Sequence, residues 1–340
     1  MKKNLMSFFA FTMIVLIFLT ACSDSTSTNT EDDIDIEEKV MKVSHNQQPT
    51  HPVHVALESF KKEVEEKTNG SVIVDLYPSA TLGDDQTNLD QVSLGSIQAG
   101  ITMGSLANLV VGTDDPRALF EELPFMFPDA EAARKAWDGP LGEQYKELGR
   151  EHGLEVLCHW ENGFRNMTNN IRPIVIPKDM EGIKFRIAPS EMRQLLFKEL
   201  NATAIPMAFP ELFTGLQQGT VDGQENPLSI IETSKFYEVQ KYLSLSRHIY
   251  NTATFYVNPD WFNSLTAEEQ EIIQEASEKA RDYMRELNDE FEATSIKTLE
   301  DNGMEVNEID REAFVTAAEP VWEYYVSNYE GGQELIDMAQ

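Results

Sequence analysis

The chain has 340 residues, which is enough to bury two hydrophobic cores of ordinary domain size without the help of disulfides. Its 58 Asp and Glu residues against 27 Lys and Arg residues give a formal net charge of −31 at pH 7. Because no basic stripe is available to neutralise phosphates, nucleic acid is not expected as a partner, and the acidic excess is typical of a protein that stays soluble outside the cell.

The N-terminus has the pattern of a secretory signal peptide. Two lysines precede an apolar run at 5–19, which is shorter than the ~20 residues that a transmembrane helix needs. The run ends in Leu-Thr-Ala before Cys22, a pattern that resembles a bacterial lipobox, so we expect cleavage after residues 1–21 and lipid on Cys22. An ordinary cleaved signal with an unrelated cysteine is the alternative. Residues 22–38 are mostly Ser, Thr, Asn, Asp and Glu, which predicts a flexible tether.

Residues 39–162 alternate between strand and helix patterns. The segments 39–43 and 72–77 have the composition of strands, and apolar residues recur between them at helical spacing. This βαβ pattern predicts a parallel sheet. Further strands are expected at 99–103 and 154–160, and further helices after Asp84, at 130–137 and at 141–151. Cys158 lies in an apolar run, and we expect it to be a buried, unreactive thiol.

A second alternating series begins near Gly163. Strands are predicted at 164–168 and 183–188, and helices at 191–200 and 211–218. From 266 to about 300 the pattern is helical without Gly or Pro, far longer than the average helix of roughly 11–12 residues, so this helix can lie across two lobes. We therefore predict an α/β chain in which lobe I comprises 39–162 and roughly 252–290, and lobe II comprises 163–251 and roughly 291–340.

The sequence carries no recognisable catalytic motif. It lacks Gly-x-Ser-x-Gly, a phosphate-binding loop ending in Lys-Ser or Lys-Thr, His-Glu-x-x-His and Cys-x-x-Cys, so we predict neither an enzymatic activity nor a cofactor. His45, His51 and His54 form one cluster of possible metal ligands. Prolines flank them and no carboxylate in the same loop completes a set, so loop and cap roles are the preferred interpretation and no metal is predicted.

Arginines near the ends of two predicted strands are candidates for binding an anion. In Ile-Lys-Phe-Arg-Ile at 183–187, the strand period of two places the apolar residues on one face and Arg186 on the other. The following Ala188-Pro189 ends the strand, and ligands of open α/β sheets bind at the carboxyl ends of strands. Arg165 occupies a similar position in the preceding strand. The alternative is that either arginine pairs with one of the many surface acids.

The segment Val-Asp-Gly-Gln-Glu-Asn-Pro at 221–227 is a further candidate. Asp222 and Gly223 predict a tight turn, and Pro227 fits the first turn of a helix. Glu225 and Asn226 would then lie beside a helix N-terminus, where an anion is favoured. By itself, an asparagine before a proline is equally explained as a helix cap.

These segments resemble the DctP-type substrate-binding proteins of TRAP (tripartite ATP-independent periplasmic) transporters. The resemblance rests on the run 220–227, on Gly-Ile-Lys-Phe-Arg at 182–186, on Phe-Tyr-Glu-Val-Gln-Lys at 236–241 and on Tyr-Pro-Ser-Ala-Thr-Leu-Gly-Asp at 77–84, in the family's order and spacing. It implies a two-lobed, periplasmic-binding-protein-like (Venus flytrap) fold with a long helix spanning both lobes.

The resemblance also implies a carboxylate site. Arg186 matches the arginine that holds the ligand carboxylate in a two-pronged salt bridge, and Arg165 matches a second arginine of the family. Asn226 matches the asparagine that completes this site, with Glu225 beside it.

Other positions line the expected cleft. Phe209 matches an aromatic residue that packs on the ligand, and Asn46 and Asp85 match polar positions of the first lobe's wall. Members that bind sialic acid have a Glu and an Arg where this chain has Met103 and Leu106. The resemblance therefore favours a smaller acid, either a C4-dicarboxylate or a uronic or other sugar acid.

The predicted function is that of an extracytoplasmic receptor, anchored to the outer face of the cell membrane by lipid on Cys22. It would bind a small organic carboxylate and deliver it to the small and large membrane subunits of a TRAP transporter. A receptor for an ABC importer or a sensor kinase would share the two-lobed form and is the first alternative. An extracellular enzyme is the second, and it would need an activated nucleophile or a metal.

Overall fold

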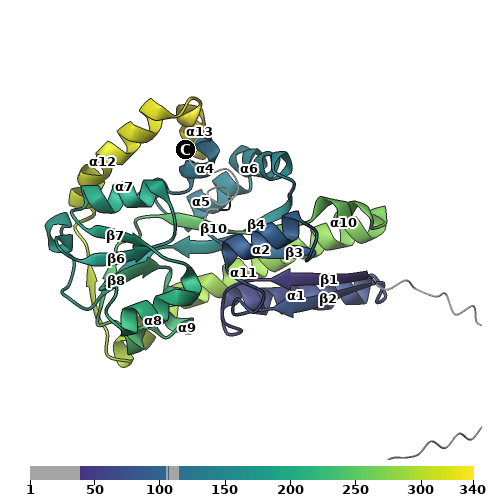
Figure 1. Cartoon of the computed structure of the whole chain (residues 1–340), viewed down its shortest axis with the longest axis horizontal. Helices are drawn as coiled ribbons and strands as arrows, with labels where there is room; N and C mark the ends of the chain where they lie inside the picture. Colours follow the sequence, from purple (N-terminus) through teal and green to yellow (C-terminus); the bar gives the residue numbers. More distant parts are fainter. Residues whose placement is uncertain (1–38, 105, 107–114) are drawn as a thin grey trace, which may run out of the picture. The chain divides into compact units, whose positions relative to one another are not determined.

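A computed structural model describes residues 39–104, 106 and 115–340 of the chain (Figure 1). The predicted signal peptide at 1–21, the lipidation site Cys22 and the tether at 22–38 lie outside the described residues. Within the described ranges, no helix is both long enough and apolar enough to cross a membrane.

The first sheet contains five strands in the order β2-β1-β3-β10-β4. Their bounds are Lys39–Ser44 (β1), Val72–Tyr77 (β2), Ala99–Met103 (β3), Glu155–Phe164 (β4) and Tyr250–Val257 (β10). β1 pairs in parallel with β2 and β3, and helix α1 (Pro52–Lys67) connects β1 to β2, so the predicted βαβ unit is confirmed. The sheet as a whole is mixed rather than parallel, because β10 enters from far along the chain and pairs antiparallel with β3 and β4.

The second sheet has six strands in the order β11-β9-β5-β8-β6-β7. Their bounds are Asn166–Asn169 (β5), Lys184–Ile187 (β6), Thr203–Pro206 (β7), Gly223–Asn226 (β8), Tyr242–Leu245 (β9) and Glu305–Glu308 (β11). The tight turn predicted at Asp222 and Gly223 is wrong, because Gly223 begins β8. A Cβ at Gly223 would lie 2.4 Å from the Thr168 carbonyl oxygen, so the glycine serves close strand approach and not a turn.

Helices flank both sheets. Their bounds are Asp85–Ser93 (α2), Pro116–Phe120 (α4), Ala130–Trp137 (α5), Pro140–Glu151 (α6), Glu191–Glu199 (α7), Leu212–Gln217 (α8), Leu228–Thr233 (α9), Pro259–Asn263 (α10), Arg311–Asn328 (α12) and Gly332–Ala339 (α13), with single 3₁₀ turns at Pro177–Met180 (η1), Phe209–Glu211 (η2) and Phe236–Glu238 (η3). Asp84 caps α2 by accepting the Thr87 N–H, as its position before that helix predicts.

The predicted long helix is confirmed as α11 (Ala267–Asp301), of 35 residues. It begins with a capping box, in which Thr266 and Glu269 each accept the other's backbone N–H. α11 packs against α1 and β4 on the side of the first sheet and against α9 and β11 on the side of the second (Figure 1). One continuous helix therefore connects the elements of both sheets.

Besides the connection through α11, the chain crosses between the two sheets at two adjacent points. β4 ends at Phe164 in the first sheet and β5 begins at Asn166 in the second, so the strand predicted at 164–168 is interrupted at Arg165. The Arg165 N–H donates to the Ile249 carbonyl oxygen at 2.9 Å, and the His248 N–H donates to the Arg165 carbonyl oxygen at 3.3 Å. The outward and return crossings are thus hydrogen-bonded to each other, with Arg165 between them.

The predicted burial of Cys158 is confirmed. Its side chain is in the core of the first sheet and is 5% exposed. Burial raises the pKa of this thiol to about 11, so the thiolate form that reacts with oxidants and electrophiles is rare at neutral pH.

Candidate functional site

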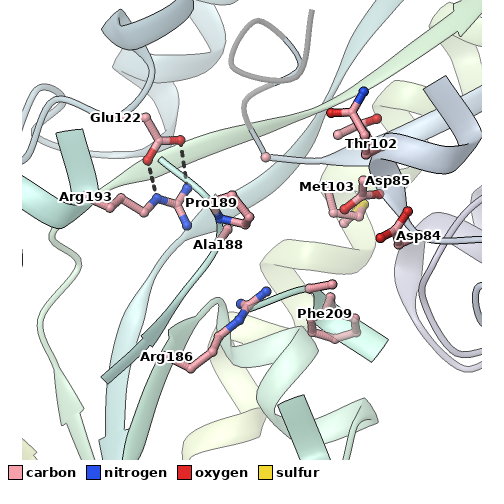
Figure 2. Close-up of a pocket in the computed structure, with 13 residues that line it drawn as sticks. Asp84, Asp85, Thr102, Met103, Glu122, Arg186, Ala188, Pro189, Arg193 and Phe209 are labelled. Carbon is pink, nitrogen blue, oxygen red and sulfur yellow. Dashed lines mark hydrogen bonds and ion pairs between the residues drawn. The ribbon is translucent and has the colours of Figure 1, made fainter. Parts of the chain in front are cut away.

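A cavity of about 90 Å³ lies between residues of the first and second sheets. Asp85 and Met103 contribute from the start of α2 and the end of β3, and Arg186 and Phe209 contribute from β6 and η2. Figure 2 shows these two groups facing each other across the pocket. Since roughly 10–15 Å³ of such space holds one water molecule, the cavity has room for a small organic ligand.

Arg186 is positioned by the alternation of strand β6. Phe185 and Ile187 are fully buried in the hydrophobic core, so the intervening Arg186 points to the opposite face and lines the cavity. Its Nε donates to the Met207 carbonyl oxygen at 2.8 Å, and its guanidinium carbon lies 5.9 Å from the centroid of the Phe209 ring. These contacts fix the direction of the guanidinium and leave its two terminal nitrogens for a ligand.

The charge of Arg186 is not neutralised by an ion pair with any described carboxylate, although the side chain is only 2% exposed. Burial lowers the pKa of Arg186 to about 9, against the raising influence of the Glu225 carboxylate. Burial disfavours a charged form unless an opposite charge or hydrogen bonds compensate. An anion bound in the cavity would supply that compensation.

Arg165 and Glu225 form a buried ion pair behind the cavity. Arg165 donates to both carboxylate oxygens of Glu225, with Nη2 2.9 Å from Oε1, and Nη2 also donates to Asn226 Oδ1 at 2.9 Å. Glu225 is fully buried and also accepts from Arg193 Nη1 at 3.0 Å. Burial would raise the pKa of Glu225, but Arg165 and Arg193 hold it well below its ordinary value.

The structure brings together only part of the predicted site. Arg186, Phe209 and Asp85 line the cavity, whereas Arg165, Glu225 and Asn226 are absent from the described residues that line it. Glu225 and Asn226 lie beside a helix N-terminus as predicted, since Pro227 is the N-cap of α9, but both belong to β8 and their polar groups bond to Arg165 and Gln224. Through these hydrogen bonds, Glu225 and Asn226 support the structure around the site.

Asn46 and Asp85 form a polar wall opposite Arg186. Asn46 Nδ2 donates to Asp85 Oδ2 at 2.7 Å, and Asn46 itself lines an adjoining groove that shares Phe209 with the cavity. Asp85 Oδ1 is buried and has no hydrogen-bond partner among the described residues. Burial, together with the neighbouring Asp84, raises the pKa of Asp85 to about 7, so near neutral pH its carboxyl group both donates and accepts hydrogen bonds.

One ion pair that lines the cavity, Glu122 with Arg193, was missed by sequence reasoning. Arg193 of α7 forms a two-pronged ion pair with Glu122, with Nη2 2.9 Å from Oε1, and both side chains are 1% exposed (Figure 2). Arg193 interrupts the apolar stripe of its helix, since Leu196 and Phe197, three and four residues later, are fully buried. A charge within an apolar helix face is the signal that would have identified it.

His45 and His51 take the predicted loop and cap roles, whereas His54 lies in the first turn of α1. His45 Nε2 lies 3.1 Å from His54 Nδ1, and His51 Nδ1 accepts the Val53 N–H at the start of α1. Burial lowers the pKa of both His45 and His51 to about 3, so these rings are neutral. In the part of the chain that the structure describes, no group of three or more His, Cys, Asp or Glu residues is arranged to hold a metal ion.

The chain is similar to known proteins in both sequence and structure. The sequence model of the family described as "Bacterial extracellular solute-binding protein, family 7" matches residues 43–328. The chain is 33% identical over 298 residues to the 2,3-diketo-L-gulonate-binding periplasmic protein YiaO of Escherichia coli K12, an alignment that covers 87% of this chain and 90% of that protein.

Two solved structures are similar along nearly their whole length. A TRAP periplasmic solute-binding protein from Polaromonas sp. JS666, bound to D-erythronate, has a TM-score of 0.84 and 35% identity, covering 89% of this chain and 98% of that one. The sugar acid binding protein DctPAm from Advenella mimigardefordensis, in complex with galactonate, has a TM-score of 0.85 and 32% identity, covering 90% and 99%. The predicted two-lobed α/β fold is confirmed by these neighbours.

Glu225→Gln is expected to destabilise the protein, because it leaves Arg165 without an ion-pair partner among the described carboxylates and Arg193 with Glu122 alone. Breaking a buried ion pair from one side costs about 3–5 kcal/mol, and urea denaturation measures the free energy of unfolding. Glu66→Gln is the control, since Glu66 is an exposed partner of Lys62 at 3.9 Å, and a change below about 1 kcal/mol is expected there. A Glu225→Gln protein as stable as wild type would contradict this assignment.

Asp85→Asn is expected to stabilise the protein at high pH but not at low pH. The folded protein holds the Asp85 proton up to about pH 7, whereas an aspartate in an unfolded chain releases it near pH 4, so the stability due to Asp85 falls as the pH rises between these values. We expect little change at about pH 4 and a gain of about 1–3 kcal/mol at about pH 8, after a discount for the partial exposure of the carboxyl.

Urea denaturation at the two pH values measures this difference. Asp90→Asn, at an exposed position of the same helix, is the control and is expected to follow the wild-type dependence on pH. An Asp85→Asn gain that is the same at both pH values would show that titration of Asp85 is not its cause.

Proposed function

The chain belongs to the bacterial extracellular solute-binding proteins of family 7, and we propose on that basis that it binds a hydroxylated sugar acid through Arg186 and delivers it to a TRAP transporter. Its relatives are solute-binding proteins of the extracytoplasmic space and not enzymes. Family membership favours the TRAP receptor over an ABC-type receptor or a sensor. The transporter's small and large membrane subunits would be the partners of the loaded receptor.

The observation that carries the proposal is the buried guanidinium of Arg186, which has no carboxylate partner among the described residues. A carboxylate in the cavity loses its water and needs fixed donors in exchange. The planar fork of arginine matches both oxygens of a carboxylate, which lysine does not. At about 1.5–3 kcal/mol for each charge-assisted hydrogen bond, two such bonds supply a large part of the ~8 kcal/mol behind micromolar affinity.

The ligand class is supported by the polar wall and by the relatives. Asp85 and Asn46 present hydrogen-bonding groups suited to hydroxyls, and the relatives described above bind 2,3-diketo-L-gulonate, D-erythronate and galactonate. Leu106, where sialic-acid-binding members have a charged residue, is 4% exposed and packs in a hydrophobic cluster. A C4-dicarboxylate is the second candidate ligand.

The two lobes would close over the ligand by bending at the two crossings at Arg165 and Ile249. We keep the boundaries 39–162 with roughly 252–290 for lobe I, and 163–251 with roughly 291–340 for lobe II, as part of the proposal. Because Arg186 and Asp85 approach the cavity from different sheets, a ligand held by both would favour the closed state over the open one.

The N-terminal pattern supports a lipid anchor. Cys22 would carry the lipid, and 22–38 would tether the receptor to the outer face of the cell membrane, close to the transporter subunits.

Arg186→Ala is the direct test of the site. Loss of two charge-assisted bonds, about 3–6 kcal/mol, predicts a roughly 10²–10⁴-fold weaker Kd for D-galactonate or D-erythronate in isothermal titration calorimetry. Arg186→Lys should recover only a small part, because an ammonium cannot bind both oxygens. Lys184→Ala, on the same face of β6 but outside the cavity lining, should bind like wild type. An Arg186→Ala protein with affinity within threefold of wild type would remove the basis of the proposal.

Cys22→Ser tests the anchor. In cells that process lipoproteins, we expect the wild-type protein to partition into the detergent phase of a Triton X-114 extract and the variant to partition into the aqueous phase. Cys158→Ser, which changes the buried thiol, should partition like wild type. Mass spectrometry that finds no lipid on Cys22 of the wild-type protein would refute the lipid anchor.

A further inference from the structure

The Glu122–Arg193 ion pair lines the cavity but has no part in the carboxylate site proposed above. Arg193 donates through Nε and Nη2 to the two oxygens of Glu122, and through Nη2 to Asn251 Oδ1 at 2.7 Å. Figure 2 shows the pair on a different side of the pocket from Arg186 and Phe209. A ligand held by its carboxylate at Arg186 can therefore meet this pair with another of its groups.

Most of the hydrogen-bonding positions that the pair leaves unused are acceptor positions. Arg193 makes four hydrogen bonds, to Glu122, Glu225 and Asn251, out of the five N–H groups of a guanidinium. Each oxygen of Glu122 accepts one bond from Arg193, whereas a carboxylate has about four acceptor positions. Glu122 can thus accept a further hydrogen bond from the cavity side.

The charges of the pair and its neighbours cancel. Glu122 and Glu225 contribute two negative charges, and Arg193 and Arg165 contribute two positive charges to one connected network. Burial alone would lower the pKa of Arg193, but Glu122 and Glu225 raise it above its ordinary value, so this guanidinium stays charged and is held by its own carboxylates. Among the described residues that line the cavity, Arg186 is then the cation whose charge is left for an anionic ligand.

A second carboxylate on the ligand would be opposed at this side of the cavity. It would approach the negative charge of Glu122, which lines this side of the cavity. Like charges repel strongly where water is excluded, and a carboxylate has no hydrogen with which to donate to Glu122. A hydroxyl group has such a hydrogen and carries no charge.

We propose that the Glu122–Arg193 pair is a second recognition point of the cavity, where Glu122 accepts a hydrogen bond from a ligand hydroxyl and excludes a second carboxylate. The inference rests on the proposed binding of an organic acid at Arg186 and narrows its ligand to hydroxylated monocarboxylates. Glu122 touches the ligand in this assignment, and Arg193 is a positioning residue that orients the Glu122 carboxylate. The C4-dicarboxylate alternative is disfavoured by the same argument.

The test compares ligands that differ only at the carbon farthest from the carboxylate. D-Galactonate and galactarate, D-gluconate and D-glucarate, and D-erythronate and meso-tartrate are such pairs, with a terminal hydroxymethyl group in the first member and a carboxylate in the second. Calorimetry on the purified full-length protein gives the Kd of each. The wild-type protein is expected to bind the monocarboxylate of a pair at least tenfold more tightly than the dicarboxylate.

Glu122→Gln removes the negative charge at nearly constant size and leaves Arg193 paired with Glu225 and Asn251. We expect its preference for the monocarboxylate to fall at least tenfold, through weaker binding of the monocarboxylate, tighter binding of the dicarboxylate, or both. Glu121→Gln is the matched control, because Glu121 is the adjacent buried acid, accepts from Thr252 and is outside the cavity lining. Its ratio of the two Kd values is expected to equal that of wild type. A purely structural role of Glu122 would lower stability without changing this ratio.

The possible outcomes separate this inference from the proposed function. Wild-type protein that binds a dicarboxylate as tightly as its monocarboxylate overturns the inference, whether or not Glu122→Gln folds. A folded Glu122→Gln protein with the wild-type ratio also overturns it, while the proposed function stands if Arg186→Ala still loses binding. If none of the acids binds the wild-type protein, both proposals are refuted together.

Discussion

A buried cation that no described carboxylate neutralises is the constraint on which the proposed site depends. Arg165 and Arg193 share Glu225, and Glu122 completes the balance, so these four side chains are neutral as a group. Arg186 lies outside this balance and is held in place by a backbone carbonyl and an aromatic ring. Keeping an uncompensated charge out of water is unfavourable, so the proposed anionic ligand would stabilise the site.

The elements nearest this cation follow from local sequence. The period of two in strand β6 separates Phe185 and Ile187 from Arg186, and the same alternation is observed in the structure. The long helix α11 and the unit from β1 to β2 were also predictable, because each is specified by spacing within one continuous segment. For such a helix or strand, the residues of its own segment are enough to predict which side chains lie on each of its faces.

The partners of the buried charges could not be predicted in this way. Glu225 bonds to Arg165, 60 residues away, and Glu122 bonds to Arg193, 71 residues away, so no local pattern joins them. Strand β8 was missed for a related reason: its four residues, Gly-Gln-Glu-Asn, are all buried by neighbouring strands although three of them are polar. The hydrogen bonds of those polar groups decide where β8 lies in the sheet. The partners of these hydrogen bonds cannot be predicted from the local sequence.

The large negative charge of the chain and the binding of an anion are compatible because they act over different distances. A formal charge of −31 creates a field that repels anions outside the protein, but ordinary salt screens it beyond about 8–10 Å. Inside the cavity, the charges in direct contact dominate, since they interact through little intervening water. In the proposed site, Arg186 would supply the positive charge next to the ligand carboxylate, while Glu122 at another part of the wall would limit how much negative charge a ligand can bring. Selectivity then follows from the arrangement of a few contacts and not from the net charge of the protein.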